Sequence, residues 1–397
     1  MRREPNRRKT ILMMGYTYYE VDPRVIREAE AARDDGFDVD VLALRREGAE
    51  PVEMVRGVRL MRLNQTKYRG SKLLVYLGTY LEFFLRCLAK TTILFFQRRY
   101  AVIHVNNMPD FLVFCTVVPR LFGTRVILDI HDPMPNTFIS KFKEGEKGFY
   151  YRLLLWQERL SAAYSSQVIT VHDPVKEGIL LQHGLPSDSI EVIANFADEQ
   201  IFPLRKSFEI NGRIRCVFHG TILERSGLRT LIQAIAQVRR KDRISVKIIG
   251  EGDFSQTLRD MIRSLRLEDV VEFDNHSYDV HTISERIGDC NVGLVPLEIS
   301  SVTNYALPLK LIEYISLGLP VVTVRSYAIS YYFGEEDCIF FEWNDPQSLS
   351  LALDRIADRP EILLHYRERA LTLRDRFSWL GEKQKYVQLL RQLLRSN

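Results

Sequence analysis

The sequence predicts an α/β protein built from two doubly wound halves. Short apolar runs alternate with helix-length segments along most of the chain, and the polar stretch 195–212, where neither a strand period nor a helix period persists, divides them into two series. Strands that alternate with helices favour a parallel sheet covered by helices on both faces. The two series are of similar length, so we expect two domains of similar size.

The first half opens with a βαβ unit. The apolar run 10–16 predicts a strand, and Asp22-Pro23 then places an N-cap acid before a proline at the first helical position. A helical period continues as far as Gly36, and residues 37–44 alternate as a strand. Further strands are expected at 58–63, 102–105, 126–130, 167–171 and 190–193.

The second half repeats this pattern and ends in helices. Strands are expected at 214–218, 246–249, 270–273, 292–295 and 320–324, and the tail 351–394 is expected to be largely helical. We therefore expect a first domain at 1–200, a second at 201–377 and a final helix at 378–397 that packs back on the first domain.

Composition excludes several classes of protein. The chain has 55 Lys and Arg against 51 Asp and Glu, a net charge of +4, which is too balanced for a nucleic-acid-binding protein. Its five cysteines lie far apart and without metal-ligand spacing, so neither a zinc site nor a disulfide framework is expected. The basic N-terminal segment has no cleavage site after it, so we expect a cytoplasmic protein with reduced thiols.

The longest apolar stretch, 73–96, is expected to be an amphipathic helix. It is long enough to cross a bilayer, but Glu82, Arg86 and Lys90 repeat every four residues and form a polar stripe, which argues against a span. Basic residues flank this helix, as an anionic membrane surface requires. The alternative is a domain helix with an apolar core side and solvated charges. The basic residues are Arg56, Arg59, Arg62, Lys67, Arg69, Lys72, Arg86, Lys90, Arg98 and Arg99.

Ligands of doubly wound sheets lie beyond the carboxyl ends of the strands, and two segments there carry the expected chemistry. The turn 219–227 offers Gly220, the backbone amide of Thr221 and the cation Arg225 just before a helix, which together suit a phosphate. The alternative is a turn that only connects a strand to a helix.

The second segment is the helix that begins after Pro308. The Leu309 amide and the Lys310 ammonium lie at its start and would favour a diphosphate, and Glu313 lies one turn on, where a carboxylate can accept ribose hydroxyls. The alternative is an exposed ion pair between Lys310 and Glu313.

These motifs together resemble the GT-B glycosyltransferases, closest to the large retaining family that includes sucrose synthases and bacterial polysaccharide transferases. The resemblance covers nearly the whole chain, and its last block is similar to that of transferases that build cell-surface polysaccharides and lipid-linked glycans. It rests on 22–30, 36–41 and 129–135 in the first half, and on 219–225, 250–252, 307–314 and 318–322 in the second.

The resemblance implies two Rossmann-like domains facing each other across a cleft, and a transferase that moves a sugar from a nucleoside-diphosphate sugar to a lipid-linked or polysaccharide acceptor. It also implies retention of anomeric configuration without a protein nucleophile. We expect no cofactor, and from the basic amphipathic helix we expect a peripheral association with the inner face of the plasma membrane. No metal is required, and we interpret Asp38-Val39-Asp40 as a solvated strand start rather than a metal site.

The remaining candidate residues follow from the same resemblance. His131 would bond the donor sugar or hold the acceptor, or else be a turn residue in a His-Asp pair. Gly15 would leave room for a substrate at the first strand's end. Glu251 and His276 are candidates for base recognition.

One position departs from the family pattern of two glutamates separated by seven residues. The second glutamate matches Glu313 and the first falls on Tyr305, so Asn304 or Thr303 is the candidate substitute. Two other functions stay open, a nucleotide-sugar epimerase of the same fold and a chain that binds a glycan or partner without turnover.

Overall fold

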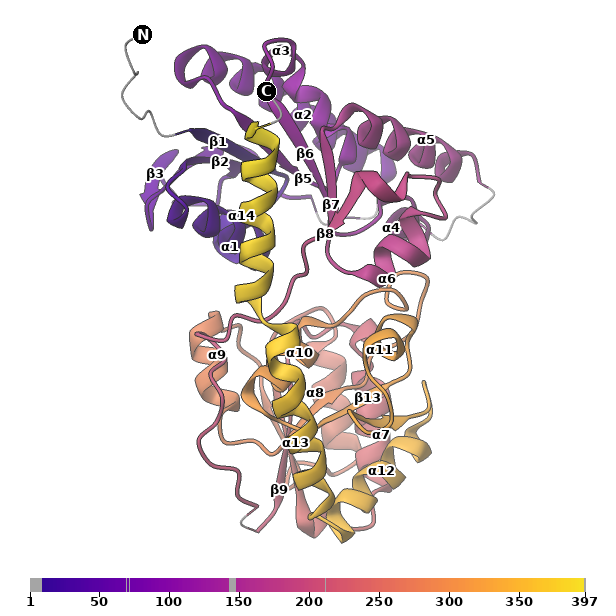
Figure 1. Ribbon diagram of the computed structural model, residues 1–397. Helices are drawn as coiled ribbons and strands as arrows, with labels where there is room; N and C mark the ends of the chain where they lie inside the picture. Colours follow the sequence, from indigo (N-terminus) through magenta and orange to yellow (C-terminus); the bar gives the residue numbers. More distant parts are fainter. Residues whose placement is uncertain (1–8, 69, 71, 143–147, 211, 396–397) are drawn as a thin grey trace. The chain divides into compact units, whose positions relative to one another are not determined.

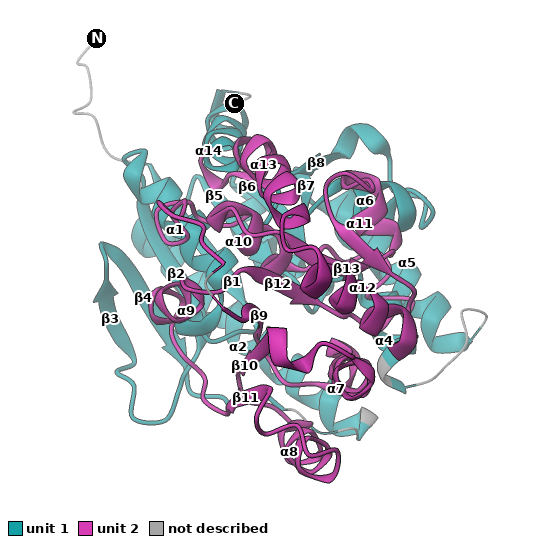
Figure 2. Ribbon diagram, turned by 90° about the horizontal axis from the view of Figure 1, so that it is seen from below, with its two compact units in different colours: residues 1–195, 381–397 teal, residues 196–380 magenta. Residues whose placement is uncertain are grey.

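The computed structural model describes residues 9–68, 70, 72–142, 148–210 and 212–395. The chain divides into two compact units, unit 1 with residues 1–195 and 381–397 and unit 2 with residues 196–380 (Figure 2). Both are α/β units of Rossmann type, as the sequence predicts.

Unit 1 is built on an eight-stranded sheet in the order β3-β4-β2-β1-β5-β6-β7-β8. All neighbouring strands are parallel except β3 and β4. The strands are β1 (Thr10–Gly15), β2 (Asp38–Leu44), β3 (Val52–Val55), β4 (Val58–Leu63), β5 (Val102–Asn106), β6 (Arg125–Ile130), β7 (Gln167–Thr170) and β8 (Ile190–Val192).

Strand β3 is a departure from the expected all-parallel sheet. It pairs with β4 through a two-residue turn in which Arg56 (φ 47°) and Gly57 (φ 80°) both take positive φ. Such turns are signalled by Asn-Gly or Asp-Gly, and Arg-Gly carries a weaker signal. Val52 and Met54 are exposed on this edge strand, so its apolar pattern does not mark a core.

The first helix of unit 1, α1, begins at a capped N-terminus. The side chain of Asp22 accepts from the Val25 amide and caps α1, and Pro23 occupies the first turn. Helix α14 (yellow) crosses in front of the strands of this unit (Figure 1). The helices are α1 (Pro23–Asp34), α2 (Leu73–Arg98), α3 (Val117–Leu121), α4 (Met134–Phe142), α5 (Phe149–Tyr164), α6 (Asp173–Val175) and α14 (Trp379–Arg395), the last from residue 381 onward.

Unit 2 is a six-stranded, wholly parallel sheet in the order β11-β10-β9-β12-β13-β14. Its last strand, β14 (Ile339–Phe341), was not expected because its three residues form too short a run to stand out. The other strands are β9 (Ile214–His219), β10 (Ile244–Ile249), β11 (Val271–Asp274), β12 (Val292–Val295) and β13 (Val321–Val324).

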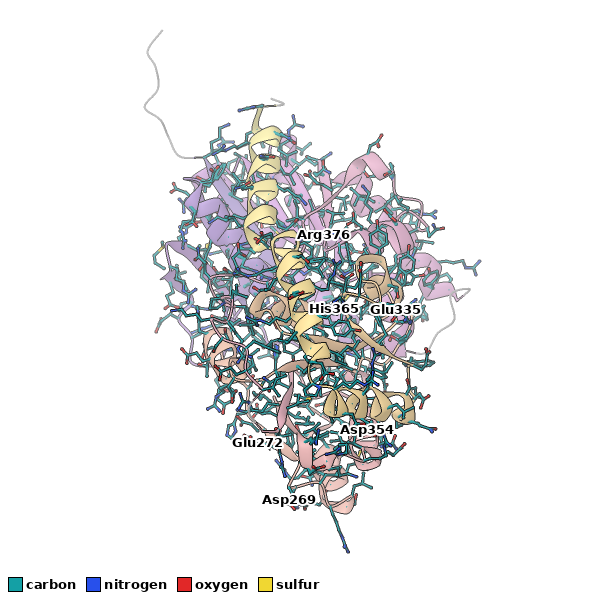
Figure 3. The ribbon with its side chains drawn as sticks, turned by 60° about the horizontal axis from the view of Figure 1, so that its bottom comes forward. Asp269, Glu272, Glu335, Asp354, His365 and Arg376 are labelled. Carbon is teal, nitrogen blue, oxygen red and sulfur yellow. The ribbon has the colours of Figure 1, made fainter. Side chains whose placement is uncertain are left out.

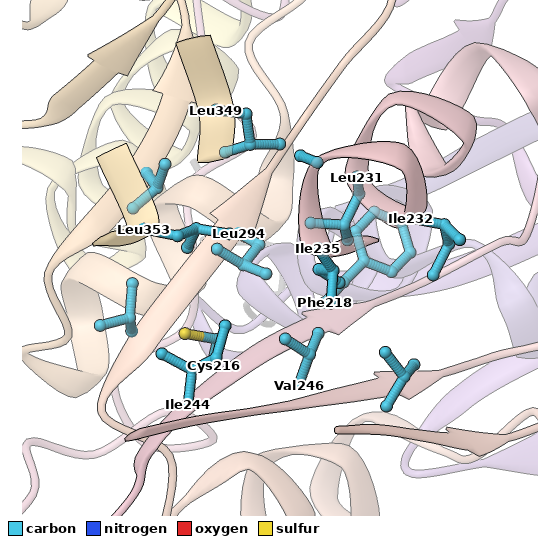
Figure 4. Close-up of a cluster of buried hydrophobic side chains, with 14 of the residues drawn as sticks. Cys216, Phe218, Leu231, Ile232, Ile235, Ile244, Val246, Leu294, Leu349 and Leu353 are labelled. Atoms are coloured by element: carbon cyan, nitrogen blue, oxygen red, sulfur yellow. The ribbon is translucent and has the colours of Figure 1, made fainter. Parts of the chain in front are cut away.

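The core of unit 2 lies between its sheet and flanking helices. Cys216 and Phe218 of β9 pack with Leu231 and Ile235 of α7 and with Leu353 of α12, and all five are fully buried (Figure 4). The helices are α7 (Leu228–Gln237), α8 (Ser255–Ser264), α9 (Val280–Ile287), α10 (Leu309–Leu317), α11 (Tyr327–Tyr332), α12 (Pro346–Asp358) and α13 (Ile362–Arg374).

Buried polar groups fix the helices of this unit. Asp354 of α12 (Figure 3) accepts from the backbone amides of Arg239 and Arg240, just past the end of α7. The tail expected to be helical, 351–394, is helical over α12, α13 and α14.

Candidate functional site

The strand order of unit 2 places a switch point between β9 and β12. Chain order runs outward from β9 through β10 to β11 on one side and from β12 through β13 to β14 on the other. The connections after β9 and β12 therefore diverge at the carboxyl end of the sheet, where open α/β sheets hold their ligands. The sequence-predicted turn 219–227 follows β9, and α10 follows β12.

The glycines of this edge allow backbones to cross. A Cβ on Gly250 (φ +143°) would lie 1.9 Å from the carbonyl oxygen of Gly220, and a Cβ on Gly252 would lie 2.2 Å from that of Ile222. Gly227 (φ +73°) would carry its Cβ 1.6 Å from the Pro296 carbonyl oxygen. Because no side chain fits at these crossings, the loops after β9, β10 and β12 are held in close contact.

Lys310 reaches the glycine turn from the first turn of α10. Its Nζ lies 3.9 Å from the centroid of the Phe218 ring, and a Cβ on Gly220 would lie 3.2 Å from that Nζ. Burial lowers the pKa of Lys310 to about 8, although the carboxylate of Glu313 acts in the opposite direction. A partly desolvated ammonium beside a glycine turn and a helix start is an arrangement suited to an anion.

Glu313 is buried one turn further along α10 and faces His219. Its Oε2 lies 3.1 Å from Nε2 of His219, the last residue of β9. The neighbouring Tyr314 hydroxyl donates to the carbonyl of Val217 and accepts from the amide of His219. The alternative of an exposed ion pair between Lys310 and Glu313 is therefore not what the structure has, since Glu313 is buried beside His219 of β9.

Arg225 and Thr221 lie on the exposed side of the same turn. Arg225 is in a 3-10 turn (Glu224–Ser226), and its carbonyl accepts from the Glu298 amide. The carbonyl of Thr221 accepts from the Ser226 hydroxyl. Among the contacts of the described residues, Lys310 approaches the glycine turn with its side chain, whereas Arg225, which is part of the turn, contacts the neighbouring loop through its backbone carbonyl.

The candidates for base recognition occupy two different loops. The carbonyl of Glu251 accepts from the Ile222 amide, so this residue belongs to the crossing beside Gly220, with its side chain exposed. His276 is exposed and its Nδ1 lies 3.1 Å from Asp274, which also binds the Tyr278 hydroxyl.

Asn304 anchors a neighbouring helix. Its side-chain oxygen accepts from the amide of Tyr327, and its carbonyl accepts from Ala328, both at the start of α11. Tyr305, at the position of the family's first glutamate, packs its ring on Tyr327 with centroids 5.1 Å apart. Leu309 is the first residue of α10, directly after its N-cap Pro308.

Unit 1 has its own switch point, between β1 and β5. Gly15 ends β1 opposite Asn106 of β5, and a Cβ on Gly15 would lie 3.2 Å from the Asn106 Cβ. His131 follows β6, the next strand, at the same edge of the sheet.

His131 is the partly exposed end of a buried ion network. Its Nε2 lies 2.8 Å from Oδ2 of Asp129, while Arg24 of α1 contacts both oxygens of that carboxylate, at 2.7 and 2.9 Å. The exposed fraction of the His131 side chain is 19%, against 3% for Arg24 and 0% for Asp129. Although burial opposes both shifts, Arg24 lowers the pKa of Asp129, and Asp129 raises the pKa of His131.

Five members of the network, Arg24, Glu28, His104, Asp129 and Tyr386, were not predicted from the sequence as site residues. His104 lies within β5, with Nε2 3.5 Å from Asp129 and 3.7 Å from Glu28, and its Nδ1 lies 2.8 Å from the hydroxyl of Tyr386 on α14. A histidine inside an otherwise apolar strand signals a buried polar partner, but the sequence does not say which residue that partner is.

Ligand atoms of Glu28, His104 and Asp129 lie within 4.8 Å of one another, a spacing that could hold a metal ion. Arg24 already binds both oxygens of Asp129 and lies 3.2 Å from Glu28 Oε1. We interpret the group as a buried ion network, because a guanidinium in that place would repel a cation.

The interpretation of Asp38-Val39-Asp40 as a solvated strand start is wrong for Asp40. Its side chain is fully buried and accepts from Arg59, Arg98 and the Tyr100 hydroxyl. The two acids lie at neighbouring positions of one strand, and the buried one is surrounded by cations from β4 and α2.

Comparison with known proteins follows the same division of the chain. Residues 21–195 match the family described as "Glycosyl transferase 4-like domain", and residues 200–372 match "Glycosyl transferases group 1". The chain is 28% identical over 152 residues to the putative colanic acid biosynthesis glycosyltransferase WcaL of Escherichia coli. That alignment spans 37% of this chain and 36% of WcaL, about a third of either protein.

Solved structures match over nearly the full chain. The sucrose-phosphate synthase of Thermosynechococcus elongatus superposes with a TM-score of 0.76 at 19% identity, covering 98% of this chain and 100% of that one. The Anabaena protein Alr3699/HepE, solved in complex with UDP, superposes with a TM-score of 0.71 at 14% identity, covering 97% and 100%. At these identities the likeness establishes the fold.

Proposed function

This chain belongs to the GT-B glycosyltransferases, and from that premise we propose that it transfers a sugar from a nucleoside-diphosphate sugar to a hydroxyl group of a lipid-linked or polysaccharide acceptor. The observation that carries the proposal is the position of Lys310, whose Nζ approaches both Gly220 and the Phe218 ring at the carboxyl edge of unit 2. UDP in the complex of the Anabaena protein supports a nucleotide donor, and the WcaL match supports a polysaccharide acceptor.

In the proposed reaction the bond between the sugar's anomeric carbon and the diphosphate oxygen breaks. The bonding electrons leave with the diphosphate, the acceptor oxygen forms the new bond on the same face, and the acceptor proton moves to a phosphate oxygen. Lys310 and the first amides of α10, at Leu309, would stabilise the negative charge of the leaving diphosphate. Thr221 and the more exposed Arg225 would add to this stabilisation from the opposite loop.

Glu313 would accept the ribose hydroxyls of the donor. It is already buried, with Oε2 3.1 Å from His219 Nε2, so a carboxylate acceptor is in place at this strand end before any ligand arrives. Glu251 and His276 stay candidates for the base, and Asn304, which also anchors the start of α11, stays a candidate for the place of the missing first glutamate.

In unit 1 we assign His131 to the sugar or the acceptor, with Gly15 leaving backbone room nearby. A protonated imidazole, favoured by Asp129, can donate from its remaining nitrogen to a sugar hydroxyl or a phosphate oxygen. We also propose that the transfer retains the anomeric configuration of the sugar and needs no metal ion.

The proposal is tested by nucleotide binding and by product analysis. Thermal unfolding with UDP, GDP and a panel of nucleotide sugars should show protection by at least one of them. With that donor, Lys310→Ala and Glu313→Gln should each lower turnover at least about tenfold without lowering the melting temperature, about what one lost charge-stabilising contact costs. Full activity in either variant would contradict the site.

Product analysis separates the alternatives. Donor incubated alone should give slow release of free sugar and nucleoside diphosphate, and conversion to an isomeric nucleotide sugar would instead identify an epimerase. Tight nucleotide binding with no hydrolysis and no transfer to any glycan would identify a binding protein.

The location we propose is the surface of an anionic membrane. No helix among the described residues is long and apolar enough to cross a bilayer. Helix α2 is nevertheless apolar on two sides: Tyr80 and Phe83 face the core, whereas Leu74, Leu81 and Leu85 are exposed, Leu74 by 84%. Helix α2 therefore exposes apolar side chains beside the exposed Glu82 and Arg86, and a membrane interface would cover such an amphipathic surface.

The predicted basic patch is smaller than the sequence suggests. Arg59 and Arg98 contact the buried Asp40, Arg62 contacts Glu20, and Arg86 contacts Glu82, so these guanidinium groups serve the fold. Arg69 lies outside the described residues. Lys72 precedes α2 and is exposed.

Vesicle binding tests this location. Leu81→Asp together with Leu85→Asp should weaken sedimentation with phosphatidylglycerol-containing vesicles at least about tenfold, because two exposed apolar side chains are replaced by anions. Leu351→Asp on α12 is the matched control, since Leu351 is 57% exposed and Leu81 and Leu85 are each 55% exposed. Equal binding of all three proteins would contradict membrane docking through α2.

A further inference from the structure

The buried network of unit 1 is arranged around one accessible group. Its buried members come from four elements: Arg24 and Glu28 from α1, His104 from β5, Asp129 from β6 and Tyr386 from α14. His131 is the partly exposed group that contacts them, through Asp129. Burying charges is costly unless they are well paired, and a well-packed apolar cluster would serve stability at least as well. The arrangement is therefore better explained by what it does for His131.

The first link is the grip of Arg24 on Asp129. Its Nε and Nη2 each contact one carboxylate oxygen, and its Nη1 donates to the carbonyl of Ile193 at 2.7 Å. Three fixed contacts leave the Asp129 carboxylate one orientation, in which Oδ2 faces His131 Nε2. The orientation of the His131 ring thus depends on Arg24, a residue more than a hundred positions away in the chain.

The second link is the tautomer of His104. The Tyr386 hydroxyl is fully buried, and His104 Nδ1 at 2.8 Å is the hydrogen-bond partner that the structure gives it. For the neutral ring we assign the Tyr386 hydroxyl as the donor, because a neutral His104 that donated from Nδ1 would turn an unprotonated Nε2 toward the carboxylates of Asp129 and Glu28, 3.5 and 3.7 Å away. With Nε2 protonated, His104 presents an N–H group to Asp129 Oδ2, the same oxygen that His131 Nε2 contacts.

We propose that Arg24 and Tyr386 are positioning residues for His131, Arg24 by orienting the Asp129 carboxylate and Tyr386 by setting the tautomer of His104 behind it. The assignment of His131 to substrate rests on the proposed function, whereas the positioning itself does not. It follows that α14, through Tyr386, contributes to the chemistry of unit 1 and not only to its stability.

Nitrogen-15 NMR of histidine-labelled protein tests the positioning without any substrate. In the unaltered protein, His104 should give the shifts of a ring protonated at Nε2. Tyr386→Phe removes only the hydroxyl, and it should introduce the Nδ1-protonated form of His104 and alter the titration of His131. Tyr164→Phe is the matched control, because it removes a hydroxyl bonded to Thr116 in the same unit and away from the network.

Activity provides a second reading with the best donor from the nucleotide-sugar panel. Tyr386→Phe should lower kcat about fivefold, the equivalent of one neutral hydrogen bond, and leave KM for the donor and the Kd of the nucleoside diphosphate unchanged. Arg24→Lys keeps the charge but cannot hold both carboxylate oxygens, and it should lower kcat further.

The outcomes separate the two ideas. Unchanged His104 and His131 signals in a folded Tyr386→Phe protein, equal to those of Tyr164→Phe, would overturn the positioning role of Tyr386. Unchanged His131 signals in a folded Arg24→Lys protein would overturn that of Arg24. If the NMR signals change as expected and no nucleotide sugar is turned over by the unaltered protein, the positioning stands and the proposed function fails.

Discussion

Raising the pH above 8 should weaken the binding of a nucleoside diphosphate to unit 2, because Lys310 loses its proton in this range. Burial lowers the pKa of this ammonium to about 8. Between pH 7 and pH 9.5 its protonated fraction falls from about 90% to about 3%. If only the charged form binds, Kd rises about 30-fold, equivalent to about 2 kcal/mol. The phosphate groups are already fully ionised above pH 8 and add nothing to the change.

Isothermal titration calorimetry with UDP and with GDP, at constant ionic strength, measures this dependence. Near pH 8, binding should take up a fraction of a proton, which appears as a difference in heat between buffers of different ionisation enthalpy. Lys310→Arg keeps its charge throughout the range and should give a nearly constant Kd. Lys310→Met should bind weakly at every pH.

The reasoning would be refuted by a Kd that changes less than threefold from pH 7 to pH 9.5 for the unaltered protein. It would also be refuted by a change of the same size in Lys310→Arg, because the titrating group would then be another residue or the base of the nucleotide. Either result would mean that Lys310 does not face the diphosphate.

Three further results are expected for folding stability. Gly227→Ala should lower the free energy of unfolding by about 3 kcal/mol or more in urea denaturation. The control is Gly212→Ala, which should cost only about 1 kcal/mol, because Gly212 has a φ of +82° but nothing within 4 Å of the added Cβ. Equal costs would contradict the backbone crossing. Asp40→Asn should cost about 3 kcal/mol by calorimetry, because two guanidinium groups lose their partner, and Asp38→Asn, at a side chain 41% exposed, should cost below about 0.5 kcal/mol. The pKa of His131 is raised in the folded protein, so its ion pair stabilises the fold fully below the unfolded pKa of about 6.5 and no longer does so once the pH exceeds the folded pKa. His131→Asn should therefore lower the free energy of unfolding more at pH 6 than at pH 9. A loss that is independent of pH would argue against the ion pair.

The parallel sheets were predictable because their strands are short, apolar and separated by helices with clear starts. Asp22-Pro23 marks the start of α1 in the sequence and caps it in the structure. What was missed lacks such a signal: β3 is an exposed edge strand after an Arg-Gly turn, and β14 has three residues. Edge and very short strands gain their pairing from neighbours that are distant in sequence, so local patterns describe them poorly.

The site in unit 2 was predictable as segments and less so as contacts. Glycine, a cation and a helix start near two strand ends indicated the loops that meet, because parallel strands end at one edge. The partner of Glu313 was not predicted, since sequence spacing on a helix favours Lys310 whereas the fold brings His219 of β9 within 3.1 Å. Pairs between different elements depend on register and side-chain direction, which one sequence does not display.

The network of unit 1 shows the same limit. The sequence suggested the adjacent Asp132 as the partner of His131, whereas the structure pairs His131 with Asp129, and His104 and Tyr386 are separated by most of the chain. A buried tyrosine in the middle of an amphipathic helix resembles ordinary core, and only the folded arrangement gives its hydroxyl a histidine to bond.

Helix α14 has a consequence for how the molecule is made. Residues 381–395 complete the first unit, yet all of 196–380 leaves the ribosome before them. At roughly 5 to 20 residues per second, this delay lasts about 10 to 40 seconds. During that time the first unit of the nascent chain lacks helix α14, so His104 has no hydrogen bond from Tyr386. Such a nascent chain exposes the surface that α14 later covers, where chaperones can bind. Errors made late in translation, within α14, would therefore destabilise the unit that was synthesised first.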